Sequence, residues 1–437
     1  MRAFSRGLVF FIACAFAPAP VWAIPSDVTH YGKAIVIAQP DETSTLSGIE
    51  LFVRAGLDRQ TPHENGLAAL VAECVLRTSV GKPAAPLRDA VAHLGGSLTY
   101  TVDGTDVRFY AEGLSRNVPS GVLPLLTEAL RAPDFSVPTL AAARTALDRK
   151  IADNQRLPLT VGMEMLNSAF FVNSDAGLPQ FGLPSTLAAQ TAAGAEAFYR
   201  ANYRRDGAVV SAVGALSNLP TTQLEALLDV LPAGSSSPAS VSLSSLRGAS
   251  RHLVAHRDIN VPWLVAQFPA PSIGSRDFGP MLVLSAFLER ATSEVAENPT
   301  VTTVPFADRA VGTFYNFDTQ PANVVLYING GFGDPSRPFA TALSVVQIFA
   351  RSKLAGDIGS LKTAAAGNYL QTATTLEDRA WLAGVFAMQS GSADYVSGAL
   401  NAIERVTPAD LQRVARAYLS NPTVAIVLPR DESLPPT

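Results

Sequence analysis

Residues 49–79 read IELFVRAGLDRQTPHENGLAALVAECVLRTS, and this stretch decides the fold. The first five residues predict a β-strand, because apolar and other side chains alternate and β-branched and aromatic residues are frequent. The turn that follows is polar and contains a proline. GLAALVAECVLRTS then predicts a helix with a broad apolar face, so the chain begins with a strand that leads into a buried helix.

A second copy of this pattern lies 213 residues further along, as measured from Gly66 to Gly279. WLVAQFPAP (263–271) predicts a strand and GPMLVLSAFLERATSEV (279–295) a helix. A hairpin is predicted after each helix, around a DG turn in residues 97–113 and a QPAN turn in residues 313–330. Long alanine-rich helices are expected after the hairpins, at Leu140–Gln155 and Pro338–Phe349.

The two halves also close alike. TAAGAEAFYRANYRRDGAVVSAVG (191–214) predicts a helix that ends near Tyr203 and a strand from Val209 to Val213. TPADLQRVARAYLSNPTVAIVLP (407–429) predicts a helix that ends at Tyr418 and a strand from Val424 to Leu428. Each segment opens on threonine, a good helix N-cap. An internal duplication follows from the shared order of elements.

We therefore expect an α+β fold with two homologous lobes, each a mostly antiparallel sheet with helices packed on one face. The serine-rich stretch PAGSSSPASVSLSS is typical of a linker. The predicted boundaries are a signal peptide at 1–23, an N-terminal lobe at 24–231, a linker at 232–247 and a C-terminal lobe at 248–437.

The N-terminus predicts export. Arg2 and Arg6 precede the short apolar run Leu8–Ala17, and Val21-Trp22-Ala23 supplies a cleavage site, so a signal peptide is favoured over a membrane anchor. Only Cys74 remains after cleavage, so the mature chain has no internal disulfide. The net charge of −4 and the scattered basic residues argue against a nucleic-acid partner. We expect a periplasmic or secreted protein without a membrane span after cleavage.

The segment VRAGLDRQTPHENGLAALVAEC (53–74) resembles the start of the pitrilysin/insulinase family of inverted zincin metallopeptidases. In that family a strand and a turn lead into a helix that carries H-x-x-E-H. The resemblance continues through KIADNQRLP (150–158), QFGLP (180–184), the closure at Tyr203 and the second copy. It therefore covers nearly the whole mature chain and implies the LuxS/MPP-like metallopeptidase fold for both lobes.

The family's metal site implies four positions here. Two histidines four residues apart bind zinc from one helical face, a glutamate beside them activates a water, and a distal carboxylate completes the ligands. The resemblance places Ala69 and Glu73 at the histidines, Ala72 at the glutamate and Lys150 at the distal carboxylate. All four are changed, and an ammonium repels a dication. We expect no catalytic residue, metal or cofactor, and we expect Glu73 to face Lys150.

The other possible metal ligands offer no replacement. His63 and Glu64 are predicted to lie in a surface turn, and His93 near a helix end. His252 and His256 lie in a predicted strand, where residues four apart are separated by about 13 Å. The fifth histidine, His30, stands alone near the N-terminus.

No other catalytic motif is present. Gly330–Gly333 is followed by Asp334 and Pro335 where a phosphate would need a helix N-terminus, so it predicts a turn. The sequence contains no G-x-S-x-G. Cys74 lies within a predicted buried helix, where packing is favoured over nucleophilic chemistry.

The family resemblance also implies a partner. In two-chain bacterial relatives one subunit carries H-x-x-E-H, and the other supplies an arginine and a tyrosine from its second lobe. The matching segment SEVAENPTVTTV (293–304) has Glu294 and Val301 at those positions.

We therefore interpret the chain as an inactive zinc-peptidase homologue, a pseudoenzyme of the pitrilysin family. Its expected partner is an active H-x-x-E-H subunit, with which it encloses a peptide substrate as a heterodimer in proteolysis. Two alternatives remain open. One is an atypical metallopeptidase that uses zinc, and the other is a stand-alone protein that binds extended peptides or acts as a scaffold.

Overall fold

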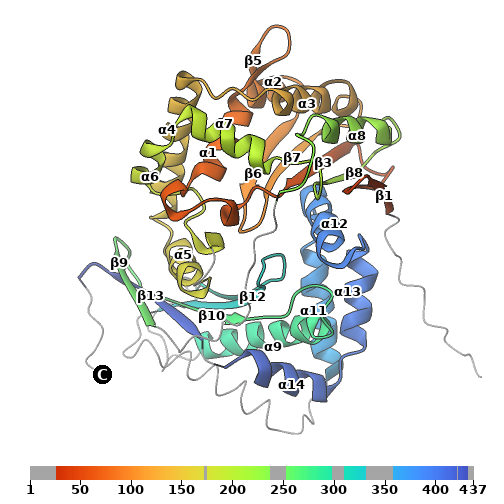
Figure 1. Ribbon diagram of the computed structural model, residues 1–437. Helices are drawn as coiled ribbons and strands as arrows, with labels where there is room; N and C mark the ends of the chain where they lie inside the picture. The colour runs from red at the N-terminus through yellow and green to blue at the C-terminus, as the bar shows by residue number, and fades with distance from the viewer. Residues whose placement is uncertain are drawn as a thin grey trace, which may run out of the picture.

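The computed structural model describes residues 26–171, 175–236, 252–297, 310–330, 358–420 and 422–431. Several predictions concern residues outside these ranges: the signal peptide at 1–23, most of the linker at 232–247, the helix at 338–349, the turn after Gly330, and Val301. The described residues form two layered α+β units, one above the other in Figure 1.

The first unit contains a six-stranded sheet with the order β1-β2-β8-β3-β7-β6. Strands β2 and β8 are parallel, and every other neighbouring pair is antiparallel. Its strands are β1 (Asp27–Tyr31), β2 (Ala34–Pro40), β3 (Leu46–Val53), β6 (Ser97–Val102), β7 (Val107–Leu114) and β8 (Val209–Gly214). A small separate pair, β4 (Ser79–Val80) and β5 (Ala85–Pro86), follows the first helix.

The second unit contains a five-stranded sheet with the order β11-β12-β10-β13-β9. Its one parallel pair is β13 with β9. The strands are β9 (His252–Arg257), β10 (Trp263–Pro269), β11 (Val311–Asn316), β12 (Asn323–Asn329) and β13 (Thr423–Pro429). Without β1, the first sheet repeats this order strand for strand, including the parallel pair near one edge. The structure thus confirms the predicted α+β fold with two homologous lobes.

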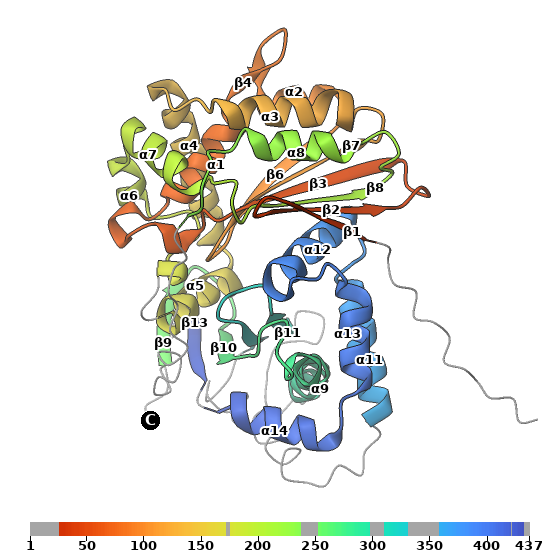
Figure 2. The same ribbon diagram turned by 45° about the vertical axis from the view of Figure 1, so that its right-hand side comes forward.

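Helices of each lobe cover the outer face of its own sheet (Figure 2). In lobe one these are α1 (Leu67–Arg77), α2 (Leu87–His93), α3 (Leu123–Arg131), α4 (Val137–Asn154), α6 (Pro184–Ala189), α7 (Ala192–Asn202) and α8 (Thr221–Asp229). In lobe two they are α9 (Phe278–Glu297), α11 (Ile358–Gln371), α13 (Tyr395–Glu404) and α14 (Pro408–Tyr418). Short helical turns lie at Leu57–Arg59, Pro62–Glu64, Val118–Val122 and Asp175–Gly177.

Two further helices cross between the lobes. Helix α5 (Pro158–Phe170) follows the helices of lobe one but packs on β10 and β13 of lobe two, and α12 (Leu376–Ser390) of lobe two packs on β3 and β8 of lobe one. Each helix has a glycine where it contacts the other lobe. A Cβ on Gly384 would lie 2.3 Å from the Phe52 ring, and one on Gly162 would lie 2.7 Å from a Val265 methyl. The inner face of each sheet is therefore covered by a helix from the other lobe, in addition to the predicted helices on one face.

The predicted helix starts are confirmed in detail. Thr191 caps α7 by accepting a hydrogen bond from the Gly194 amide, and Thr407 caps α14 in a capping box with Asp410. Within the described residues, no helix is both long and apolar enough to cross a membrane.

Candidate functional site

The site that the sequence singles out lies on α1. Residues 67–76 of this helix are buried, so apolar packing surrounds it on nearly every side. The chain enters the helix at Gly66, whose φ of 94° is left-handed and whose Cβ, if present, would lie 2.9 Å from the Phe181 carbonyl oxygen. Glu73 is fully buried in this helix. A buried carboxylate of this kind needs partners, because an isolated charge in an apolar environment is very costly.

Three cations supply those partners. Arg77 Nη2 lies 3.0 Å and Arg88 Nη2 lies 3.5 Å from Glu73 Oε1, and Lys150 Nζ lies 3.4 Å from Glu73 Oε2. Arg77 comes from the next turn of α1, Arg88 from α2 and Lys150 from α4. The predicted contact between Glu73 and Lys150 is confirmed.

Aromatic groups fix the position of Lys150. Its Nζ donates a hydrogen bond to the Tyr100 hydroxyl at 2.9 Å, and it lies 4.1 Å from the centre of the Tyr100 ring and 5.2 Å from that of Phe181. Burial lowers the pKa of Lys150, while the Glu73 charge opposes that shift. Burial and then the Glu73 charge raise the pKa of Tyr100 well above its ordinary value, so its hydroxyl stays protonated.

The residues do not fit a zinc ion. Ala69 and Ala72 are fully buried methyl groups without a donor atom, and the one carboxylate, that of Glu73, is already paired with cations. Zinc needs three or four nitrogen, sulfur or oxygen donors. The three neighbouring cations would also repel a dication. No catalytic step through a metal follows from this arrangement.

The remaining candidate ligands lie apart from one another. His63 lies in the turn Pro62–Glu64, where Glu64 accepts a hydrogen bond from the Thr61 amide at 3.0 Å, and His93 is the last residue of α2. His30 lies on β1 and His256 on β9. Among the described residues, no group of three or more histidine, cysteine, aspartate or glutamate side chains is placed to hold a metal ion. The side chains of His252 and Glu294 lie outside the described part of the structure.

Cys74 follows Glu73 on the buried face of α1. Its side chain is fully buried, and burial raises the pKa of its thiol to about 12. The thiol is therefore protonated at neutral pH, which disfavours nucleophilic chemistry.

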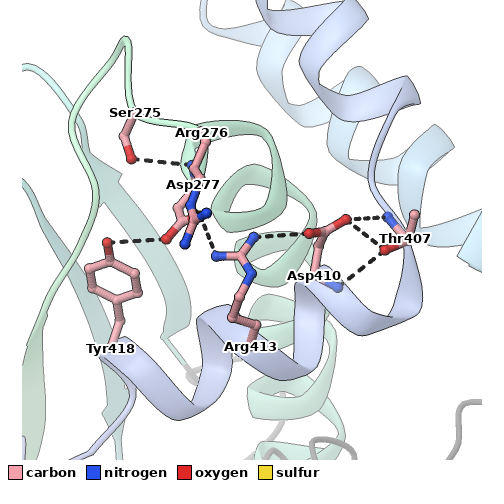
Figure 3. Close-up of polar contacts among 7 residues, drawn as sticks. All are labelled: Ser275, Arg276, Asp277, Thr407, Asp410, Arg413 and Tyr418. Atoms are coloured by element: carbon pink, nitrogen blue, oxygen red, sulfur yellow. Dashed lines mark hydrogen bonds and ion pairs between the residues drawn. The ribbon is translucent and has the colours of Figure 1, made fainter.

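A second polar cluster ties α9 to α14 in lobe two (Figure 3). Arg413 donates hydrogen bonds to Asp277 and, at 2.9 Å, to Asp410. The Tyr418 hydroxyl lies 3.4 Å from the other oxygen of Asp277, and Asp410 also accepts a hydrogen bond from Thr407. Arg276 Nε also lies 3.6 Å from Asp277 Oδ1, so two arginines balance the two aspartates. The cluster joins the first and last helices of lobe two.

A cavity that the sequence does not predict lies between the lobes. It has a volume of about 300 Å³ and lies between the β6–β7 turn, α5 and the β11–β12 turn. Six amide side chains contribute to its lining: Asn154, Asn167, Gln180, Asn316, Gln320 and Asn323. The DG and QPAN turns are visible in the sequence, but their meeting depends on how the lobes pack.

Next to this cavity, acidic groups surround Arg108 of β7. Its guanidinium lies 2.6 Å from Asp103, 3.7 Å from Asp106 and 3.7 Å from Glu50. Burial raises the pKa of Glu50 to about 8 and that of Asp318, from lobe two, to about 6. The group is a partly neutralised acidic cluster at the junction of the lobes.

Comparison with known proteins agrees with this architecture. The family described as Insulinase (Peptidase family M16) matches residues 35–182, which include α1 and α4. The mitochondrial-processing peptidase subunit beta of Dictyostelium discoideum is 22% identical over 192 residues, which span 44% of this chain and 41% of that protein.

Solved structures resemble nearly the whole chain. A protease from Helicobacter pylori has a TM-score of 0.78 at 13% identity and covers 93% of this chain and 100% of its own. A peptidase M16 inactive domain from Pseudomonas fluorescens gives 0.79 at 14% identity, with 94% and 100% covered. A chain of Complex III2 from Candida albicans gives 0.75 at 12% identity, with 92% and 95% covered. At such identities the likeness concerns the fold.

Proposed function

This chain belongs to the insulinase family of peptidases, M16, and from that premise we propose that it is a non-catalytic member of the family. In this proposal it is an exported subunit that pairs with an active H-x-x-E-H peptidase in the periplasm or outside the cell. Its lobes form half of a chamber around an extended peptide, and the partner provides the zinc and the catalytic base.

The charge at the degenerate metal site carries the proposal. One buried carboxylate with three cations within 3.5 Å is a poor environment for a dication. The buried methyl groups of Ala69 and Ala72 add no donor.

The comparisons support a role within an assembly. The Dictyostelium relative is named as a subunit, one solved structure is of Complex III2, and another is described as an inactive domain. These statements concern those proteins, and their extension to this chain is part of the proposal.

Two measurements test the proposal. Affinity purification of the tagged full chain from its native host should recover a homologous chain with intact H-x-x-E-H, and adding this chain to that peptidase should raise its peptide-cleavage rate. Metal analysis of the isolated, tag-free chain should find well under one zinc per molecule. One zinc per chain together with chelator-sensitive cleavage would instead establish the atypical metallopeptidase. Peptide binding without any partner peptidase would favour the stand-alone alternative.

A further inference from the structure

The cations around Glu73 carry more positive charge than the structure neutralises. Glu73 contributes one negative charge, and Arg77, Arg88 and Lys150 contribute three positive charges. Among the ion pairs of the described residues, none of these three cations has a second acidic partner. Two positive charges are therefore left over, although the chain as a whole has a net charge of −4. The surplus is a local property of this site.

The surplus charge is within reach of a ligand. The side chains of Arg88, Lys150 and Arg77 are 45%, 36% and 30% exposed, whereas Glu73 beneath them is fully buried. Lys150 is already held by Tyr100 and Phe181, so an incoming anion would not have to order it. The site is preorganised for an oxyanion.

The neighbouring strand β6 indicates what kind of molecule could carry the anionic group. β6 is the last strand of the first sheet, and Tyr100, which contacts Lys150, lies in its middle. No described strand pairs with the outer edge of β6. An open edge can accept an extended peptide as an additional strand. A peptide bound there would run past the cations, and its side chains would point alternately toward them and away.

We propose that Arg77, Arg88 and Lys150 bind the carboxylate of an acidic side chain in an extended peptide that lies along β6. The site that has lost its metal ligands would thus select acidic peptides. This inference rests on the proposed function only in taking a peptide as the ligand. The charge surplus stands on the structure alone.

Binding of two peptides to the isolated full chain tests the inference. Both are ten residues long with blocked ends and differ only in one central residue, Glu or Gln. At low ionic strength the Glu peptide should bind about tenfold more tightly, since charge-assisted hydrogen bonds are roughly twice as strong as neutral ones. Added salt should reduce that preference, because the cations are partly exposed.

Variants locate the preference. Arg88→Met and Lys150→Met each leave Glu73 with two cations, and each should lower the preference about threefold, with the double variant abolishing it. Arg156→Met is the matched control: it removes the same charge two residues after α4, from a side chain that is 80% exposed and pairs with Asp153. The control should keep the full preference.

Four outcomes would overturn the inference. They are equal binding of the two peptides, a preference that survives in the double variant, binding of neither peptide at millimolar concentration, and binding of inorganic phosphate as tight as that of the Glu peptide. The last would mark a site for free oxyanions. Recovery of a partner peptidase is a separate result, so a chain that prefers the Glu peptide but has no partner would refute only the proposed subunit role.

Discussion

The two lobes share an order of strands but use charge differently next to their first helices. In lobe two, Asp277 and Asp410 are balanced by Arg413 and Arg276, and the cluster only joins α9 to α14 (Figure 3). In lobe one, a single acid on α1 is paired with three cations. A balanced cluster is satisfied by its own members. An unbalanced cluster has surplus positive charge that can bind an anion. This difference distinguishes a structural joint from a candidate binding site within one duplicated fold.

The largest effect should come from removing the acid of lobe one. Glu73→Gln leaves three cations facing one another, and we expect a loss of about 3 kcal/mol of unfolding free energy, at the lower end for a broken buried ion pair because the cations reach solvent. Asp277→Asn in lobe two should cost only about 1 kcal/mol, because Asp410 still pairs with Arg413. Urea denaturation of both variants measures the contrast. Equal losses would mean that the imbalance has no energetic consequence.

The crossing helices allow a second comparison between the lobes. Gly384→Ala would place a methyl group 2.3 Å from the Phe52 ring and should destabilise by about 2–3 kcal/mol through overpacking. Gly162→Ala meets a Val265 methyl at the longer distance of 2.7 Å, so we expect a smaller loss of about 1 kcal/mol. Thermal unfolding of the two variants measures which substitution destabilises the protein more. A larger loss for Gly162→Ala would contradict the packing described for α12.

The dependence of stability on pH should also differ between a buried acid of lobe one and an acid of lobe two. The native pKa of Glu50, about 8, lies above that of an unfolded glutamate, so the folded chain holds one more proton between roughly pH 4 and 8, and stability falls as pH rises across this window. Glu50→Gln should therefore remove this contribution to the decline in unfolding free energy between pH 5 and 8. Unfolding free energies at both pH values measure this. If the unfolding free energy of the variant and of the unaltered chain fell equally with pH, Glu50 would not be the source of the decline.

Asp410 of lobe two should change stability with pH in the opposite direction. The hydrogen bond from Thr407, followed by that from Arg413, lowers the pKa of Asp410. This contribution is present above the ordinary pKa of an aspartate, about 4, and is lost as pH falls through the lowered value. Asp410→Asn should thus change the pH profile only in acid and leave the range from pH 5 to 8 unaltered.

Removing one of the surplus cations should have the smallest effect on stability. Arg88 is 45% exposed and lies 3.5 Å from Glu73, so Arg88→Met should change the unfolding free energy by less than about 0.5 kcal/mol. Peptide binding should respond to the same substitution. A variant that instead lost several kcal/mol would identify Arg88 as part of the structural joint and remove the contrast with lobe two.

Much of the fold follows from periodicity. The strand, turn and helix around Gly66, the hairpins and the capped closing helices all depend on neighbouring residues, and each lies where the sequence predicts it. Within the site, the contact of Glu73 with Lys150 was predictable because the family resemblance aligns positions that share a metal. Arg77 on α1 and Arg88 on α2 are not predicted from the sequence, because neither position belongs to the family's metal motif. The exchange of α5 and α12, and with it the cavity and the Arg108 cluster, depends on packing between distant segments that local patterns do not encode.

The exchange of α5 and α12 makes the molecule a domain swap within one chain. Each sheet relies on a helix encoded in the other half of the gene, so neither half has a complete interior of its own. A break in the chain between the halves would therefore leave two parts, each of which needs the other's helix to cover a sheet face.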